Sequence, residues 1–283
     1  MNAISKVIAA ALAVAVSCTN TGNRRTKNAV KEAFRIPQVP EMITDNEGRI
    51  EYLMDHWWDS WTPQLDSADA EVAFANWCGL SQMAELKESR RSIVKAVSKD
   101  SLRILRFAQK YLYDPNSPLR DEDIYGALAE HTGDRITAEA CSLNERGTKA
   151  ADFVFEDARG NRNTLYGVEA PWTILFFSNP GCHACKDIIE ALSYDEKVSV
   201  AVARGIVAVV NIYIDEDLDA WREYLPAYPK KWHTGFDPLF TLRDDSVYHI
   251  RAIPSVYLLD YEKKVVLKDT STERLLQTLN DRI

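Results

Sequence analysis

A short apolar run that ends in a pair of cysteines constrains the fold of this sequence more than any other feature. The run Ile174–Phe177 is bulky and is bounded by residues 179–181, which read Asn-Pro-Gly. Short, bulky segments beside turn residues are typical of buried strands. After the cysteines, apolar residues recur at helical spacing over 187–192. The sequence therefore predicts a strand, a tight turn and a helix, with both cysteines at the turn.

The first cysteine, Cys182, is separated from Cys185 by His183 and Ala184, and Lys186 follows. At the start of a helix, unpaired N–H groups and the helix dipole favour a thiolate over a thiol. We therefore expect Cys182 to have a lowered pKa and to act as the nucleophile of thiol–disulfide exchange. Cys185 would then resolve the mixed disulfide. This chemistry uses a redox-active Cys182–Cys185 disulfide, and we predict no other cofactor.

Two metal-based explanations of the cysteine pair lack supporting residues. A structural zinc site needs four ligands, and neither a second cysteine pair nor paired histidines accompany the first. We therefore predict no metal site. Covalent haem attachment requires a histidine directly after the second cysteine, where this sequence has Lys186. A copper(I) chaperone that uses both sulfurs, or a non-enzymatic binding module of the cell envelope, stays open as an alternative.

The overall composition is that of a globular protein. The chain has 283 residues, of which 46% are hydrophobic and 27% charged, enough for one large or two ordinary domains. Its formal net charge is −8, and it lacks the clustered Lys and Arg that bind phosphate backbones. We therefore expect no nucleic-acid partner.

The N-terminus has the pattern of a secretion signal. Residues 7–16 are ten consecutive apolar residues that follow Lys6. They are too few for a helix across a bilayer, which takes about 20 residues. We predict a signal peptide over residues 1–17.

The end of this signal, Ala15-Val16-Ser17-Cys18, resembles the lipobox of bacterial lipoproteins, apart from Ala15 in place of the usual leucine. The resemblance implies a lipid on Cys18 as the membrane anchor, a tether over 18–35 and a lipoprotein that faces the periplasm in the bacterial cell envelope. Cleavage after Ala15 would instead release a soluble periplasmic or secreted protein. Disulfides persist in both locations.

Residues 36–147 have the pattern of a mostly α-helical domain, to which the sequence assigns no role. Apolar residues at three- and four-residue spacing predict helices over Arg49–Trp61, Ala68–Leu86, Ser92–Tyr113 and Asp121–His131. Pro115 should end one helix, and Ser117 and Pro118 should begin the next as N-cap and first residue. Clustered tryptophans in helices are usually core, which is the prediction for Trp57, Trp58, Trp61 and Trp77.

Two further cysteines, Cys78 and Cys141, fall in this helical region. Cys78 precedes a glycine and has no second cysteine at redox spacing, so we do not assign it to a redox motif. In an oxidising compartment the two residues could form a structural disulfide, or each could be a buried thiol. Both expectations stay open at this point.

From Lys149 onward the pattern changes to strands alternating with helices. Residues 151–166 alternate around Arg159-Gly160-Asn161, which predicts a hairpin. Within the connection through Pro238, the segment Tyr228–His233 is interpreted as an exposed loop in preference to the rim of a substrate site. Further strands and helices are predicted over Gly205–Ile214, Leu218–Leu225, Ile250–Asp260, Val265–Lys268 and Thr272–Ile283. This order predicts an α/β fold, a mixed central sheet with helices on both faces.

Three separated features of residues 148–283 resemble the thioredoxin fold. They are the cysteine motif ending at Lys186, the segment Arg251–Ser255 and the segment Leu258–Asp260. More narrowly, they resemble membrane-tethered thiol–disulfide oxidoreductases. The stretch 111–122 is similar to one in an uncharacterised helical domain that precedes such domains in envelope lipoproteins.

The resemblance implies a cis bond between Ile253 and Pro254 that faces the two sulfurs, with the backbone of Ile253 pairing an extended substrate. It also implies protein thiols or disulfides as substrates and an envelope redox partner. His183, Ala184 and Lys186 would support the active site. An imidazolium at His183 can stabilise a thiolate, but the direction of electron flow stays open.

The sequence departs from the family pattern at two positions. Gly181 stands where a tryptophan usually precedes the first cysteine, and Phe176 stands where thioredoxin has a buried acid. The proton acceptor for the second cysteine is therefore unassigned, and Glu169 and Asp187 are the nearest acidic candidates. We also expect that His249 could lie near the sulfurs.

Overall fold

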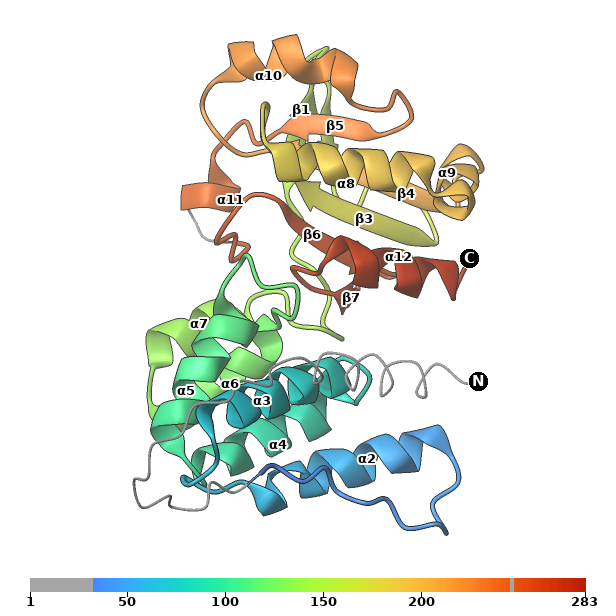
Figure 1. Ribbon diagram of the computed structural model, residues 1–283. Helices are drawn as coiled ribbons and strands as arrows, with labels where there is room; N and C mark the ends of the chain where they lie inside the picture. Colours follow the sequence, from blue (N-terminus) through green and yellow to red (C-terminus); the bar gives the residue numbers. More distant parts are fainter. Residues whose placement is uncertain (1–32, 245–246) are drawn as a thin grey trace, which may run out of the picture. The chain divides into compact units, whose positions relative to one another are not determined.

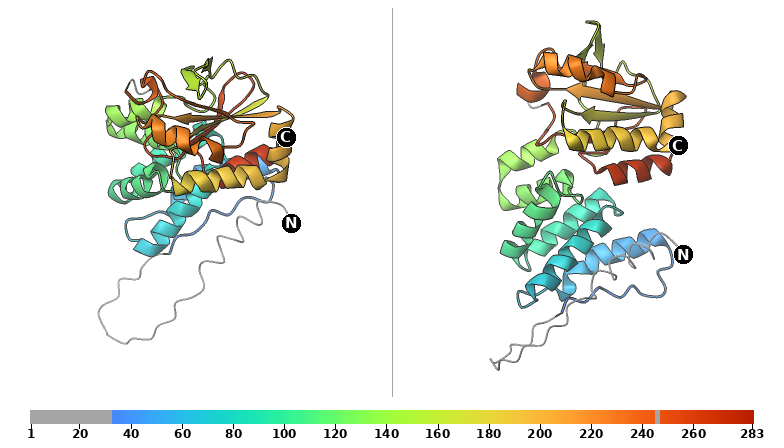
Figure 2. Two further views of the ribbon diagram at one scale, coloured as in Figure 1. Left: turned by 90° about the horizontal axis from the view of Figure 1, so that it is seen from above. Right: turned by 45° about the horizontal axis from the view of Figure 1, so that its top comes forward.

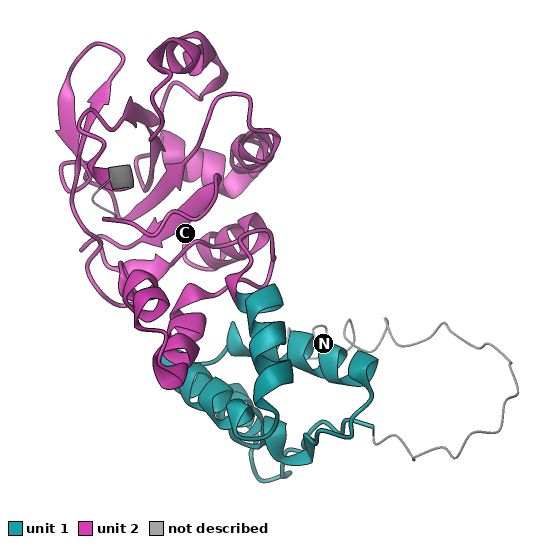
Figure 3. Cartoon of the chain, turned by 90° about the vertical axis from the view of Figure 1, so that its left-hand side faces the viewer, with its two compact units in different colours: residues 1–112 teal, residues 113–283 magenta. Residues whose placement is uncertain are grey.

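The computed structural model describes residues 33–244 and 247–283. The predicted signal peptide and Cys18 lie outside the described residues. The chain divides into two compact units, Met1–Leu112 and Tyr113–Ile283, which Figure 3 shows in two colours. No helix among the described residues has both the length and the apolar character needed to cross a membrane.

The first unit is built from helices around a tryptophan core. Its elements are α2 (Asn46–His56), η1 (Trp57–Ser60), α3 (Ser67–Ser81), α4 (Leu86–Val97), α5 (Ser101–Ala108) and the start of η2 (Gln109–Tyr113). The indole N–H groups of Trp58 and Trp77 both donate to Ser92 Oγ, at 2.9 and 3.1 Å. All four tryptophans that were assigned to the core are buried, as predicted.

Two predicted helices of this unit have different bounds. The segment Ser92–Tyr113 is not one helix, because α4 ends at Val97 and α5 begins at Ser101. Asp100 caps α5 by accepting a hydrogen bond from the N–H of Arg103, and such a cap starts a new helix even where the apolar spacing continues. The helix predicted to reach Leu86 ends at Ser81.

The second unit begins with two helices, α6 (Glu122–Thr132) and α7 (Arg135–Ser142). Asp121, not Ser117, is the N-cap of α6 and accepts from the N–H of Ile124. Ser117 Oγ instead accepts from the N–H of Leu119 within the preceding turn. The helix α7 was not predicted. Both helices belong to the same compact unit as the sheet. The predicted domain boundary at 147/148 stays a prediction.

A seven-stranded mixed sheet forms the centre of the second unit, in the order β2-β1-β5-β4-β3-β6-β7. The strands β3, β4 and β5 are parallel, whereas β6 runs antiparallel to β3. The bounds are β1 (Val154–Asp157), β2 (Arg162–Thr164), β3 (Trp172–Phe177), β4 (Val207–Tyr213), β5 (His233–Phe236), β6 (Ser255–Leu259) and β7 (Val265–Leu267). The predicted α/β thioredoxin-type fold is confirmed.

Both faces of the sheet are covered. Ile174 and Phe176 point to one face and pack under α8 (His183–Tyr194), α9 (Glu196–Ala203) and α12 (Thr272–Asn280). The helices α8 and α12 lie side by side on this face (Figures 1 and 2). Leu175 and Phe177 point to the opposite face, which is covered by extended segments and by α11 (Thr241–Asp244). This alternation is the period of two that places successive residues on opposite faces.

The connection through Pro238 contains a strand that was not predicted, β5, which begins at the last residue of the segment interpreted as a loop. After α10 (Leu218–Tyr224) and η3 (Leu225–Ala227), β5 pairs in parallel with β4 and antiparallel with β1. Gly235 allows this, because a Cβ there would lie 2.6 Å from a ring carbon of Phe155. The strand is too short for periodicity to reveal it, and its stability comes from tertiary pairing.

Candidate functional site

The cysteine pair lies at the start of α8, where β3 ends. Cys182 is the N-cap residue, and its Sγ accepts a hydrogen bond of 3.1 Å from the N–H of Cys185. The two residues form a disulfide with their Cα atoms 5.2 Å apart. Cys185 is buried at 1% exposure, while Cys182 is partly exposed. The more accessible sulfur is therefore the one that the N–H groups of the helix start can stabilise as a thiolate.

The residue before the pair explains one departure from the family pattern. Gly181 has a φ of +72°, in the left-handed region where side chains with a Cβ are strained. A tryptophan at this position would be unfavourable with the same backbone. The local turn of this chain therefore favours glycine.

The three polar or small neighbours of the pair are exposed. His183 and Ala184 form the first turn of α8 on its solvent side. Lys186 Nζ lies 3.6 Å from a carboxylate oxygen of Glu190, and both side chains are well exposed. Ion pairs of this kind contribute little to stability. The supporting roles assigned to these residues stay predictions.

The segment that contains Pro254 lies at the same end of the sheet as the cysteines. Ser255 pairs with Phe177, the last residue of β3, and the bond between Ile253 and Pro254 is cis. Ile253 also packs against the apolar cluster that includes Cys185. Among the described residues, no backbone hydrogen bond involves Ala252 or Ile253. This leaves the backbone N–H and C=O groups of the bend before β6 without backbone partners among the described residues.

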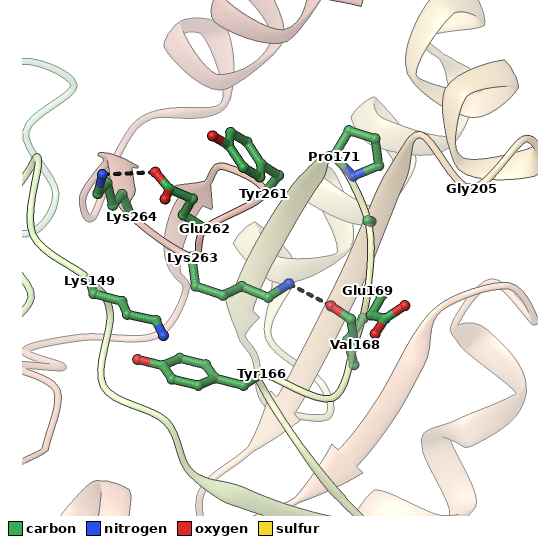
Figure 4. Close-up of a pocket in the computed structure, with 11 residues that line it drawn as sticks. Lys149, Tyr166, Val168, Glu169, Pro171, Gly205, Tyr261, Glu262, Lys263 and Lys264 are labelled. Atoms are coloured by element: carbon green, nitrogen blue, oxygen red, sulfur yellow. Dashed lines mark hydrogen bonds and ion pairs between the residues drawn. The ribbon is translucent and has the colours of Figure 1, made fainter.

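The expected carboxylate for the second cysteine is not where the sequence suggested. Glu169 lies before β3, whereas the cysteines follow that strand. A strand of this length separates its ends by on the order of 20 Å. Glu169 lines a different hollow (Figure 4). Asp187 is exposed on the surface of α8. Neither finding supports these residues as the proton acceptor.

A cluster of hydroxyl and amide groups is buried on this face of the sheet. Phe176 pairs with Asn211 across β3 and β4. Ser178 Oγ donates to the Oδ1 of Asn211 at 2.6 Å and lies 3.1 Å from the hydroxyl of Tyr228. Burial raises the pKa of Tyr228, although its hydrogen bond with Ser178 acts in the opposite direction. The sequence analysis did not identify this cluster.

The imidazole of His249 faces the carboxylate of Glu122. Its Nδ1 lies 3.3 Å from Glu122 Oε1, and the possible ligand atoms of Glu122, Cys141 and His249 lie within 4.8 Å of one another. Arg251 and Lys268 also contact the same carboxylate, which disfavours a further cation. Burial, followed by the charge of Glu122, raises the pKa of Cys141 to about 12. A protonated thiol is a poor metal ligand, so this group does not make a good metal site.

Two further cysteines among the described residues are buried thiols, Cys78 in the first unit and Cys141 in the second. The disulfide that was one of the two expectations for them is not formed. Cys141 instead packs against α6, where a Cβ on Gly126 would lie 2.8 Å from the Cβ of Cys141.

A separate hollow of about 750 Å³ lies at the amino ends of β3 and β4, away from the cysteines (Figure 4). The amine of Lys263 is buried there and donates to Val168 O and Thr173 Oγ1, at 2.5 and 2.8 Å. Burial lowers the pKa of this amine. Lys264 pairs with Glu262 at 2.8 Å. The bonds of Lys263 make it a structural group that fastens the turn before β7 to the sheet, whereas the pair of Lys264 and Glu262 lies within that turn.

Comparison with known proteins identifies the family of this chain. Residues 15–148 match a family described as a domain of unknown function, DUF5106. A crystal structure of a thioredoxin-like protein from Bacteroides caccae is 33% identical, with a TM-score of 0.74. The match covers 89% of this chain and 99% of that one. This chain belongs to the thioredoxin-like proteins.

Shorter structures match this thioredoxin-like protein over about half its length. The C-terminal domain of an uncharacterised protein from Bacteroides fragilis is 38% identical over 49% of this chain and 99% of that one, with a TM-score of 0.48. The thioredoxin domain of a thiol-disulfide oxidoreductase from Bacteroides vulgatus is 20% identical over 48% and 96%, with a TM-score of 0.43. No curated protein matched the chain.

Proposed function

We propose that this thioredoxin-like protein is an oxidoreductase that exchanges disulfides with protein thiols. The observation that carries the proposal is the position of Cys182, which is partly exposed at the N-terminus of α8 and accepts the N–H of Cys185. This arrangement stabilises a thiolate at the accessible sulfur, and the buried Cys185 lies one helical turn away to resolve it.

Both directions of the reaction use the same mixed disulfide. In reduction, the Cys182 thiolate attacks a substrate disulfide, forms a bond to one substrate sulfur and releases the other as a thiolate. Cys185, after losing its proton, attacks Cys182 Sγ and releases the second substrate thiolate. Two electrons pass to the substrate, and the Cys182–Cys185 disulfide forms. In oxidation, the same bonds form and break in reverse order, starting with attack of a substrate thiolate on Cys182.

The cellular location belongs to the same proposal. A signal peptide over 1–17 would export the protein, and a lipid on Cys18 with a tether to residue 35 would anchor it at the membrane of the cell envelope, facing the periplasm. Protein disulfides persist in that compartment, so substrates and an envelope redox partner would be available there. Support comes from the sequence pattern of the N-terminus.

The proposal is tested by disulfide exchange with purified protein. Wild-type protein should reduce insulin disulfides in the presence of dithiothreitol and should be oxidised by a small aromatic disulfide. Cys182→Ser should abolish both reactions, whereas Cys78→Ala, a buried thiol outside the site, should preserve them. An inactive wild-type protein that binds copper(I) stoichiometrically would overturn the proposal in favour of a metal chaperone.

A further inference from the structure

We propose that Glu122 and Arg251 position the backbone at Ala252 and Ile253 for protein substrates, so that they govern exchange with proteins and not with small disulfides. The inference rests on the proposed function and adds a substrate-positioning role for the segment 113–148. This segment includes the end of the DUF5106 match and belongs to the same compact unit as the sheet.

Glu122 is a fully buried carboxylate surrounded by cationic groups. Its side chain has 0% exposure and contacts Arg251 Nε, and Lys268 Nζ and His249 Nδ1 each lie at 3.3 Å. Burial alone would raise the pKa of Glu122, but the adjacent His249 and the charges of Lys268 and Arg251 lower it to about 2. A charge buried at this depth is tolerated only where its partners are held in place.

Arg251 is fixed from three directions. Glu122 holds its Nε, and Asp269 Oδ2 lies 3.3 Å from its Nη2. Its guanidinium also lies 4.4 Å from the ring centre of Tyr113, which stacks on Tyr125 at 4.3 Å. The residue directly before Ala252 therefore has little freedom to move while these contacts persist.

The same segment holds the chain on both sides of this arginine. Upstream, Asn144 Nδ2 donates to the carbonyl of Val247 at 2.8 Å. Downstream, Arg120 Nη2 donates to the carbonyl of Thr270 at 2.9 Å, and the N–H of Thr270 donates to the carbonyl of Val256. Side chains from 113–148 thus fasten both ends of the stretch 247–256.

The backbone between these fastened points is the part available to a substrate. Among the described residues, Ala252 and Ile253 make no backbone hydrogen bonds, and Ile253 packs against the apolar cluster that Cys182 also contacts. An extended peptide can add to such a backbone as a further strand, which brings a disulfide within it to the nucleophile. A small disulfide needs only access to Cys182, so its reaction is independent of this backbone.

The experiment compares two substrates in the full chain. Reduction of insulin and of a small aromatic disulfide is measured with wild type, Glu122→Gln, Arg251→Lys and Arg146→Gln. Arg146 is the matched control, because it is largely buried and pairs with Asp121 and Asp123 at 2.7 Å. The side chain of Arg146 thus bonds to acids within the helical segment, and among the described residues it forms no hydrogen bond or ion pair with the stretch 247–256.

Glu122→Gln should lower kcat/KM for insulin about tenfold, mainly by raising KM. The reason is that a misplaced binding element weakens substrate binding but leaves the reacting sulfurs unchanged. The small-disulfide rate should stay within about twofold. Arg251→Lys keeps the charge and should give a smaller loss on insulin. Arg146→Gln should change the rates on both substrates by the same factor or leave both unchanged.

Parallel losses on the two substrates would overturn the inference and leave a structural role for Glu122. The same insulin-selective loss in Arg146→Gln would also overturn it. If Glu122→Gln does not fold, Arg251→Lys tests the inference by the same comparison, the loss of rate on insulin relative to the loss on the small disulfide. Wild-type protein inactive toward both substrates would refute the proposed function itself, and with it the inference, a result distinct from loss of selectivity.

Discussion

The two parts of the candidate site are held in place by different forces. The cysteines lie on an apolar layer, in which Cys185 packs with Phe176 and Leu192 between the sheet and α8. The stretch before Pro254 is held by buried charges, chiefly Glu122 and Arg251. Apolar packing tolerates modest changes in shape, whereas a buried ion pair becomes costly as soon as one partner is lost. The two parts should therefore respond differently to mutation and to pH.

Loss of the buried carboxylate should have the largest effect on stability. Glu122→Gln should reduce the free energy of unfolding by about 3–5 kcal/mol, because it leaves Arg251 and Lys268 with less compensating charge. Leu192→Ala, on the apolar side, should cost about 2–5 kcal/mol by creating a cavity. Urea unfolding measures both. A loss below 1 kcal/mol for Glu122→Gln, with Leu192→Ala in its expected range, would contradict the account.

The pH dependence should separate the two variants. The pKa of Glu122 falls from 4.5 to about 2 in the folded protein. Between these values the unfolded state binds more protons, so this contribution to stability is complete above about pH 4.5 and is lost as the pH falls toward 2. Leu192→Ala should keep this acid sensitivity, whereas Glu122→Gln should reduce it. The comparison uses unfolding midpoints measured across this pH range for wild type, Glu122→Gln and Leu192→Ala. The same change of midpoint with pH in all three proteins would contradict this prediction.

The buried hydroxyl cluster should contribute a smaller amount. Tyr228→Phe removes the hydroxyl that lies 3.1 Å from Ser178 Oγ. We expect a loss of about 1 kcal/mol in unfolding free energy, the usual value of a buried hydrogen bond between neutral groups. Thermal unfolding measures it. An unchanged or raised stability would show that the cluster does not stabilise the apolar side.

The surface pair beside the cysteines should matter least. Lys186→Ala removes an exposed contact with Glu190, and the expected change in unfolding free energy is about 0.5 kcal/mol or less. The measurement is the same urea titration. A change above 1 kcal/mol would mean that Lys186 has a partner or role beyond this pair.

The sequence predicted the cysteine side of the site because its determinants are local. The strand, the turn at Gly181, the helix and both cysteines fall within 172–194, so apolar spacing and turn residues were sufficient to place them. The resemblance to the thioredoxin fold added Pro254 and correctly predicted the fold of residues 148–283. It did not reveal β5, whose four residues depend on pairing with β4 and β1.

The charged side could not be predicted in the same way. In the sequence, Asp121 and Glu122 need no distant partner to explain them, because acidic residues are favourable in the first turn of a helix. Their partners are far away in the sequence, with Arg251 129 positions after Glu122. Pairings at such separations leave no periodic pattern in a single sequence. The break between α4 and α5 was missed for another reason, because the cap at Asp100 interrupts apolar spacing that itself continues.

The most direct test of the central claim is to trap the mixed disulfide. Cys185→Ser removes the resolving thiol, so that a substrate should stay bonded to Cys182. Non-reducing gels and mass spectrometry of the purified variant mixed with a disulfide-containing protein should show a covalent adduct at Cys182 that dithiothreitol releases. Adduct should be absent from Cys182→Ser. Failure of folded Cys185→Ser to form any adduct, with a thiol at Cys182 verified as accessible, would contradict thiol–disulfide exchange at this site.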